Sequence, residues 1–347
     1  MGDNPYDESI ATDLTAPTTP HQTWHAPLAW LGGDELSSDV VIEARDGVIA
    51  SVSQGSPSPA ATRLRGIVLP GLVNTHSHAF HRLLRGKTHR LGGDFWLWRE
   101  RMYRAAASLT PDYCEEVATA VFVEMAMAGI TTVGEFHYLH HQTEGVPYED
   151  ANEMGHAVIR AARAAGIRIC LLDAGYFTAG LGGRALDPVQ RRFADESPDH
   201  WLDRVDALRQ AFEGADDVVI GLAPHSVRAV PRAGLERVAD RRPPDAPVHI
   251  HVSEQPAENQ ECLESTGLSP TGLLDATGVL SAHTTLVHAT HVSDEDIALI
   301  ERSGSSVCLC PTTERDLGDG VGRAPELVAA GALLCIGSDS HAVIDPF

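Results

Sequence analysis

Short apolar runs alternate with amphipathic stretches along most of the chain. A run of about four to eight apolar residues bounded by turn residues is typical of a buried strand, whereas apolar positions that recur every three or four residues indicate a helix. On this basis we predict eight strands, near residues 67–75, 130–136, 167–173, 218–223, 247–252, 284–288, 305–310 and 332–337.

Stretches with helical periodicity separate these strands. The clearest begins with Thr110 as N-cap and Pro111 in the first turn, presents Val121 and Met125 on one face, and ends at Gly129. Further helices are predicted at about 151–165, 198–213, 256–276 and 293–303. The alternation predicts an α/β fold, a TIM-like (β/α)8 barrel. A doubly wound open sheet is the alternative, although no Gly-rich phosphate loop follows any predicted strand.

The N-terminal part of the chain has a different pattern. Its first residues are polar, acidic and rich in Pro and Thr, which predicts disorder. Two β-like runs, 40–44 and 48–52, flank an Asp46-Gly47 turn and predict a hairpin. We therefore divide the chain into a disordered tail (1–22), the N-terminal part of a small β domain (23–66) and the barrel (67–347).

The sequence stops at Phe347, just past the predicted eighth strand. A complete barrel needs one more helix there. We therefore expect the C-terminal helix to be missing, and an inactive, truncated metal-binding fragment is one alternative interpretation of the chain.

Composition narrows the class of protein. With 26 Lys and Arg against 48 Asp and Glu, the net charge is −22, which argues against a nucleic-acid partner. No apolar run approaches the length of a membrane span. The six cysteines are scattered, without a CxxC pair, so we expect reduced thiols and a cytoplasmic location.

Polar side chains gather where the predicted strands end. In a (β/α)8 barrel these ends and the loops after them carry the active site, and unpaired buried polar groups are too costly to be mere packing. The strand-end residues are His76, His78, Glu135, His137, Tyr138, His225, Arg228, His251, Glu254, His288, Asp339 and His341.

Four of these residues have the chemistry of a metal site. His76 and His78 alternate along an extended strand and share one face. With His251 they can give three nitrogen ligands to one divalent metal, and Asp339 can give an oxygen. A metal bound in this way lowers the pKa of its water to about 7.

Two further residues can serve the reaction of that water. Glu254, three residues past His251, can shuttle a proton. His288 can polarise the attacking water or stabilise an oxyanion. The sequence thus predicts Glu254, His288 and Asp339 as catalytic residues of a metal-dependent hydrolase.

The same residues resemble the amidohydrolase superfamily in its one-metal, deaminase-like branch. No lysine ends the fourth strand, so the two-metal branch with a carboxylated lysine is disfavoured. From about residue 40 onward the chain more closely resembles the formimidoylglutamate deiminase family. That resemblance is carried by NTHSHAF (74–80), FWLWRE (95–100), AGITTVGEFHY (128–138), VHIHVSEQ (248–255), LVHATH (286–291) and LGDG (317–320).

The resemblance implies hydrolysis of a C–N bond in a linear amidine: N-formimidoyl-L-glutamate gives N-formyl-L-glutamate and ammonia, a step of histidine degradation. It implies one zinc ion per chain on His76, His78, His251 and Asp339, although iron or manganese also suits these ligands. The substrate's carboxylates would be held by Arg99, Tyr138, His225 and Arg228.

One position departs from the family pattern. Where the family commonly has a glutamine that touches the formimino group, this chain has His81, which lacks an amide's paired donor and acceptor. The preferred substrate is therefore open among formimidoyl amino acids, and another amidine or a nucleobase stays an alternative. The resemblance also implies that the remainder of the small β domain is missing. Barrels with a side β domain often pair, so a homodimer is an expected partner arrangement.

Overall fold

The computed structural model describes residues 21–88 and 95–343. The chain divides into two compact units, Met1–Gly71 and Leu72–Phe347. The predicted disordered tail lies outside the described residues except for His21 and Gln22, and the first strand already includes Gln22. The finer division predicted at residues 22 and 66, and the expected absence of a final helix, stay predictions.

The N-terminal unit is a small sheet. Its strands are β1 (Gln22–Ala29), β2 (Ser37–Arg45), β3 (Val48–Gln54), β4 (Thr62–Arg63) and β5 (Ile67–Val68). Strands β2 and β3 pair antiparallel around the turn at Asp46 and Gly47, as the hairpin signal predicts. Ala26, Ala29 and Val40 form its small buried core.

The second unit is a parallel barrel. Its strands are β6 (Leu72–His78), β7 (Ile130–His137), β8 (Arg168–Gly175), β9 (Val218–Pro224), β10 (Val248–Val252), β11 (Thr284–His288), β12 (Ser306–Leu309), β13 (Leu333–Ile336) and β14 (Asp339–Ser340). Strand β13 pairs with β12. Two residues separate β13 from β14, which pairs with β6. The eighth barrel strand is therefore split in two pieces, and together they close the ring, which confirms the predicted TIM-like fold.

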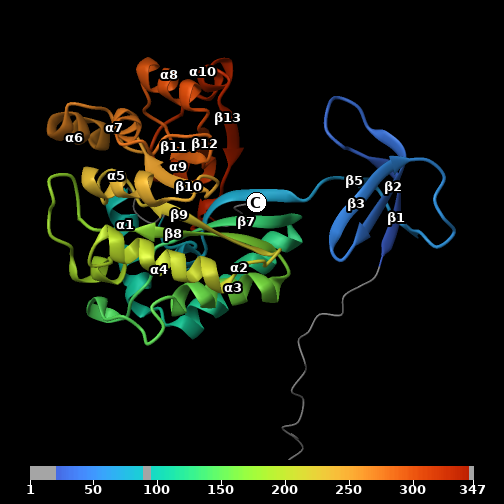
Figure 1. The fold of residues 1–347 in the computed structure, drawn as a ribbon, viewed down its shortest axis with the longest axis horizontal. Coiled ribbons are helices and arrows are strands. Elements are labelled where there is room, and N and C mark those ends of the chain that lie inside the picture. Colours follow the sequence, from blue (N-terminus) through green and yellow to red (C-terminus); the bar gives the residue numbers. More distant parts are fainter. Residues whose placement is uncertain (1–20, 89–94, 344–347) are drawn as a thin grey trace, which may run out of the picture. The chain divides into compact units, whose positions relative to one another are not determined.

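Helices surround these strands (Figure 1). The α-helices are α1 (Phe95–Ser108), α2 (Pro111–Met127), α3 (Glu153–Ala165), α4 (Pro198–Ala211), α5 (Arg232–Arg241), α6 (Pro256–Thr266), α7 (Pro270–Ala276), α8 (Asp294–Ser303), α9 (Pro311–Leu317) and α10 (Ala324–Ala329). Short 3-10 helices are η1 (Ala79–Leu84), η2 (Thr143–Gly145) and η3 (Pro188–Arg192). No helix within 21–88 or 95–343 is long and apolar enough to cross a bilayer.

Local signals set the ends of α2 as predicted. The Thr110 hydroxyl accepts a hydrogen bond from the backbone N–H of Tyr113 at 3.3 Å, which satisfies one free donor of the first turn. Gly129 follows the helix with a φ of 87°, a conformation that glycine adopts without steric cost. Between these ends, Val121 and Met125 are buried against the barrel core.

The predicted helix at 256–276 is two helices. Gly267 has a φ of 75° and ends α6, and Ser269 then caps α7 by accepting from the backbone N–H of Gly272. The left-handed conformation of Gly267 ends the helix, although the amphipathic pattern continues beyond this residue.

Candidate metal centre and surrounding pocket

Four side chains from three strands converge at the carboxyl end of the barrel. Strand β6 contributes His76 and His78, β10 contributes His251, and β14 begins with Asp339. Each pair among the three Nε2 atoms is 3.2–3.4 Å apart. Asp339 Oδ1 lies 3.4 Å from Nε2 of His76 and 3.2 Å from that of His78. The structure thus brings together all four residues that the sequence predicts as metal ligands.

Hydrogen bonds orient two of the imidazoles. His78 donates from Nδ1 to the backbone carbonyl of Phe136, and His251 donates from Nδ1 to that of His225, each at 2.9 Å. A neutral ring that donates from Nδ1 has a free lone pair on Nε2. Those lone pairs therefore face the centre of the cluster.

Burial disfavours the protonated form of two imidazoles of this cluster. Burial, with the neighbouring His78, lowers the pKa of His76 to about 4. Burial likewise lowers the pKa of His251 well below its usual value. His78 and His251, which donate from Nδ1, cannot also donate from Nε2 to one another while they are neutral, so their converging lone pairs fit a cation. Ligands about 2.0–2.1 Å from a tetrahedral metal lie about 3.3 Å apart, close to the observed spacing.

A carboxylate and an imidazole lie beside the cluster. His288 Nε2 is 3.9 Å from Glu254 Oε1 and 3.9 Å from Asp339 Oδ2. On its other side, His288 Nδ1 is 3.3 Å from Glu314 Oε1, which also accepts from the backbone N–H of Cys310. Burial alone would lower the pKa of His288, but Glu254, Glu314 and Asp339 together raise it to about 10.

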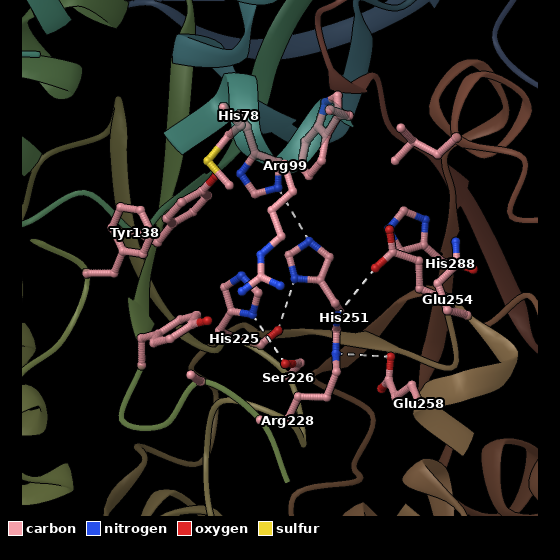
Figure 2. Close-up of a pocket in the computed structure, with 18 of the residues that line it drawn as sticks. His78, Arg99, Tyr138, His225, Ser226, Arg228, His251, Glu254, Glu258 and His288 are labelled. Carbon is pink, nitrogen blue, oxygen red and sulfur yellow. Dashed lines mark hydrogen bonds and ion pairs between the residues drawn. The ribbon is translucent and has the colours of Figure 1, made fainter. Parts of the chain in front are cut away.

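These residues open onto a cavity of about 270 Å³, whose wall includes Arg99, Tyr138, His225 and Arg228, all predicted to bind substrate. In Figure 2, Tyr138 and His288 lie on opposite sides of His251. Arg99 donates from Nε to the Tyr103 hydroxyl at 2.8 Å.

Arg228 is already held by two carboxylates. Its Nη2 is 3.4 Å from Glu254 Oε2, and its Nε is 3.4 Å from Glu258 Oε2 (Figure 2). Glu258 in turn accepts from the backbone N–H of Ser253 at 3.3 Å. The guanidinium is therefore fixed at the wall of the cavity.

His81 also lines the cavity, at its buried end. It is 1% exposed, and its Nε2 lies 2.6 Å from the Tyr138 hydroxyl. Its Nδ1 has no hydrogen-bond partner among the described residues. The residue that departs from the family pattern thus forms a pair with a predicted substrate-binding tyrosine and leaves a single ring nitrogen without a partner.

Sequence reasoning missed several residues of this pocket. Glu258, Glu314, Tyr176 and Arg184 take part in the contacts above or line the cavity. Glu258 follows Glu254 by four residues, a spacing that could have been noticed. Tyr176 directly follows β8, so the strand-end argument could have included it. For Glu314 and Arg184 the sequence holds no comparable signal, because the position of each depends on the folded barrel.

Several known proteins are similar to this chain in sequence and in fold. The profile of the amidohydrolase family matches residues 67–347. A formimidoylglutamate deiminase from Pseudomonas aeruginosa is 41% identical over 299 residues, which cover 85% of this chain and 66% of that protein. The chain thus spans just under two thirds of that relative's length.

Two further comparisons agree. An 8-oxoguanine deaminase from Pseudomonas aeruginosa is 31% identical over 336 residues, covering 93% of this chain and 72% of the relative. The crystal structure of an amidohydrolase from Brucella melitensis superposes with a TM-score of 0.87 at 41% identity, covering 93% of this chain and 72% of the other.

Proposed function

The chain belongs to the amidohydrolase family, and from that premise we propose that it hydrolyses N-formimidoyl-L-glutamate to N-formyl-L-glutamate and ammonia, a step of histidine degradation. The observation that carries the proposal is the pocket itself. It combines a cluster of three imidazoles and a carboxylate with two arginines, Arg99 and Arg228, in one cavity.

His76, His78, His251 and Asp339 would hold the metal, for which we propose zinc because three nitrogens and one oxygen suit it. Iron and manganese are alternatives that reconstitution distinguishes. When bound, the metal lowers the pKa of water to about 7 and so makes hydroxide available at neutral pH.

The reaction forms one C–O bond and breaks one C–N bond. Oxygen adds to the formimidoyl carbon, and the terminal nitrogen leaves as ammonia. Both protons of the attacking water end on that nitrogen, and Glu254 would accept each in turn and deliver it there, the first as the C–O bond forms and the second as the C–N bond breaks. His288, 3.9 Å from both Glu254 and Asp339, would orient the attack and stabilise charge on the oxygen, and Asp339 would help to orient the water.

The glutamyl part of the substrate carries two carboxylates. Arg99, Tyr138, His225 and Arg228 would bind them, with His81 near the formimidoyl end. In a protein of net charge −22, a dianion is attracted only where cations are concentrated locally. Arg99 and Arg228 bring such cations to the cavity wall, where Arg228 also pairs with Glu254 and Glu258.

Ammonia release tests the proposal. The purified chain is stripped with a chelator and resupplied with zinc, iron or manganese, then given N-formimidoyl-L-glutamate, N-formimidoyl-L-aspartate or guanine. We expect metal-dependent release from the first substrate at the highest kcat/KM. Absence of release with every metal, or faster release from guanine, would overturn the proposal.

Deamination of a nucleobase is the second candidate. It is favoured by the similarity to an 8-oxoguanine deaminase and by the aromatic side chains of Trp98, Tyr103, Tyr176 and Phe193 in the cavity wall. A planar heterocycle stacks on such rings but has no use for two arginines.

We also propose that the protein is cytoplasmic, binds neither nucleic acid nor membrane, and forms a homodimer. All six cysteines are free, which is typical of proteins in a reducing compartment. Size-exclusion chromatography with light scattering measures the oligomeric state.

A further inference from the structure

A small closed loop follows β8 at the edge of the cavity. The backbone N–H of Ala179 donates to the carbonyl of Arg184 at 2.9 Å and closes the loop. Gly182 and Gly183, with φ of 82° and 76°, make the reversal possible. This hydrogen bond fixes the backbone of Arg184 relative to Ala179, although the loop has no regular secondary structure.

A second glycine positions the Arg184 side chain. A Cβ atom at Gly180 would lie 3.1 Å from both Nε and Cζ of Arg184, and the guanidinium already fills that space. The guanidinium thus rests against the bare backbone of Gly180. Both residues line the cavity, and since Arg184 is also exposed, it lies where the cavity meets solvent.

This cation has no counter-ion in the part of the chain that the structure describes. Arg228, in the same wall, pairs with Glu254 and Glu258. Arg184 forms no ion pair or side-chain hydrogen bond with residues 21–88 or 95–343. A preformed guanidinium at a cavity opening, left without a carboxylate, is available to an anionic ligand.

We propose that Arg184 is a specificity residue that binds the side-chain carboxylate of the substrate at the opening of the cavity. This inference rests on the proposed function. The α-carboxylate is two bonds from the nitrogen that bears the formimidoyl group and so stays deep, near the metal cluster. The side-chain carboxylate is further away and reaches toward solvent, where Arg184 lies.

Kinetics of variants test the assignment against two substrates of equal size, N-formimidoyl-L-glutamate and N-formimidoyl-L-glutamine. For Arg184→Ala we expect KM for the glutamate substrate to rise about five- to tenfold with kcat unchanged. KM for the neutral glutamine substrate should stay as in the wild type, because it offers no charge to bind.

Two companion variants sharpen the test. Gly180→Ala keeps the arginine but forces its guanidinium aside, so it should raise KM for the glutamate substrate by a smaller factor. Arg232→Ala removes an exposed arginine that pairs with Glu236 on α5, outside the cavity, and should change neither KM. Melting temperatures near the wild-type value would show that the variants fold.

The results separate this inference from the proposed function. If the wild type is active and Arg184→Ala leaves KM for the glutamate substrate unchanged, only the role of Arg184 is overturned. The same holds if Arg184→Ala raises KM for both substrates by the same factor. A wild type that releases no ammonia from the glutamate substrate overturns the proposed function, and the assignment of Arg184 with it.

Discussion

A histidine ring that binds a metal through one nitrogen is well oriented when its second nitrogen forms a hydrogen bond. The three imidazoles of the cluster differ in whether they form that hydrogen bond. His78 and His251 each donate to a backbone carbonyl. Nδ1 of His76 has no hydrogen-bond partner among the described residues, and the ring is held only by contacts with its neighbours, such as Phe136 at a centroid distance of 5.2 Å. Ring orientation at His76 therefore depends on packing rather than on a hydrogen bond.

Strand β10 offers a matched pair of histidines that tests the ligand assignment. His251 faces the cluster, whereas His249 stacks near His76 at a centroid distance of 6.3 Å and is not among the converging ligands. We expect His251→Ala to lose most of its bound metal and at least about a thousandfold in kcat/KM, because one of the four ligands is gone.

His249→Ala removes a ring of the same size from the same strand and should keep about one metal ion per chain. Mass spectrometric metal analysis after gel filtration measures both variants. Equal metal content in the two would contradict the assignment.

Arg99 and Arg228, two of the arginines that line the cavity, distinguish the two candidate functions. Arg99→Ala and Arg228→Ala each remove a charge-assisted hydrogen bond to a carboxylate, which costs about 1.5–3 kcal/mol. We expect KM for N-formimidoyl-L-glutamate to rise about ten- to a hundredfold in each variant. Steady-state kinetics measures this, with Arg232→Ala as the surface control. Unchanged KM in both cavity variants would favour a heterocyclic substrate instead.

At the scale of elements, one buried arginine joins α4 to the barrel. Arg204 Nη1 donates to Asp173 Oδ2 of β8 at 2.7 Å, and its Nη2 donates to Asp195 Oδ2 at 3.0 Å. Its Nη1 also donates to the Asn152 side chain at the start of α3, at 3.1 Å. Since the guanidinium and both carboxylates are buried, each charge depends on the others for compensation.

Removing this arginine leaves two carboxylates buried without a cation. We expect Arg204→Met to lower the free energy of unfolding by about 3–5 kcal/mol, measured by urea denaturation. Arg163→Met is the control, because Arg163 forms an exposed pair with a single carboxylate, that of Asp217, and its loss should cost less than about 1 kcal/mol. Equal losses in the two variants would contradict this.

Sequence patterns predicted the elements whose signals are local. The run at 284–288 matches β11 residue for residue, and the Thr110 cap places the start of α2. Helices α1, α5, α9 and α10 were not predicted. Helices α9 and α10 have seven and six residues, too few for a helical period to appear in the sequence. For α5 a signal was present, because Pro231 precedes it as a proline often does at a helix start.

The site was predictable where it follows from strand ends. In a closed parallel barrel the carboxyl ends of all strands meet, so His76 and Asp339 come together although 263 positions separate them in the sequence. Contacts such as that between Glu314 and His288 were not predictable. They depend on where α9, which carries Glu314, packs after β12, and no spacing in the sequence determines this.

At the scale of the whole molecule, the barrel holds many uncharged histidines. Burial lowers the pKa of His137 to about 4 and that of His341 to about 3, and it lowers the pKa of His140 well below its usual value. In the unfolded chain each would titrate near 6.5. At these three positions the folded protein therefore binds fewer protons than the unfolded chain between about pH 4 and 6.5.

This difference sets the direction of the pH dependence. The stability that these groups contribute is fully present above about pH 6.5 and is lost as the pH falls toward about 4, by up to about 1.4 kcal/mol per pH unit for each group. We expect His137→Gln to reduce the slope of the unfolding free energy against pH by the contribution of one proton, about 1.4 kcal/mol per pH unit. His283→Gln, at an exposed position, should leave the slope unchanged.

Urea denaturation of chelator-treated protein at several pH values between about 7.5 and 4.5 measures these slopes without the pH dependence of metal binding. The absolute stability of His137→Gln does not matter to the comparison, because only the change with pH reports the proton. If the wild type and His137→Gln gave parallel lines, the protein would not hold this imidazole uncharged, and the acid sensitivity of the barrel would have to come from other groups.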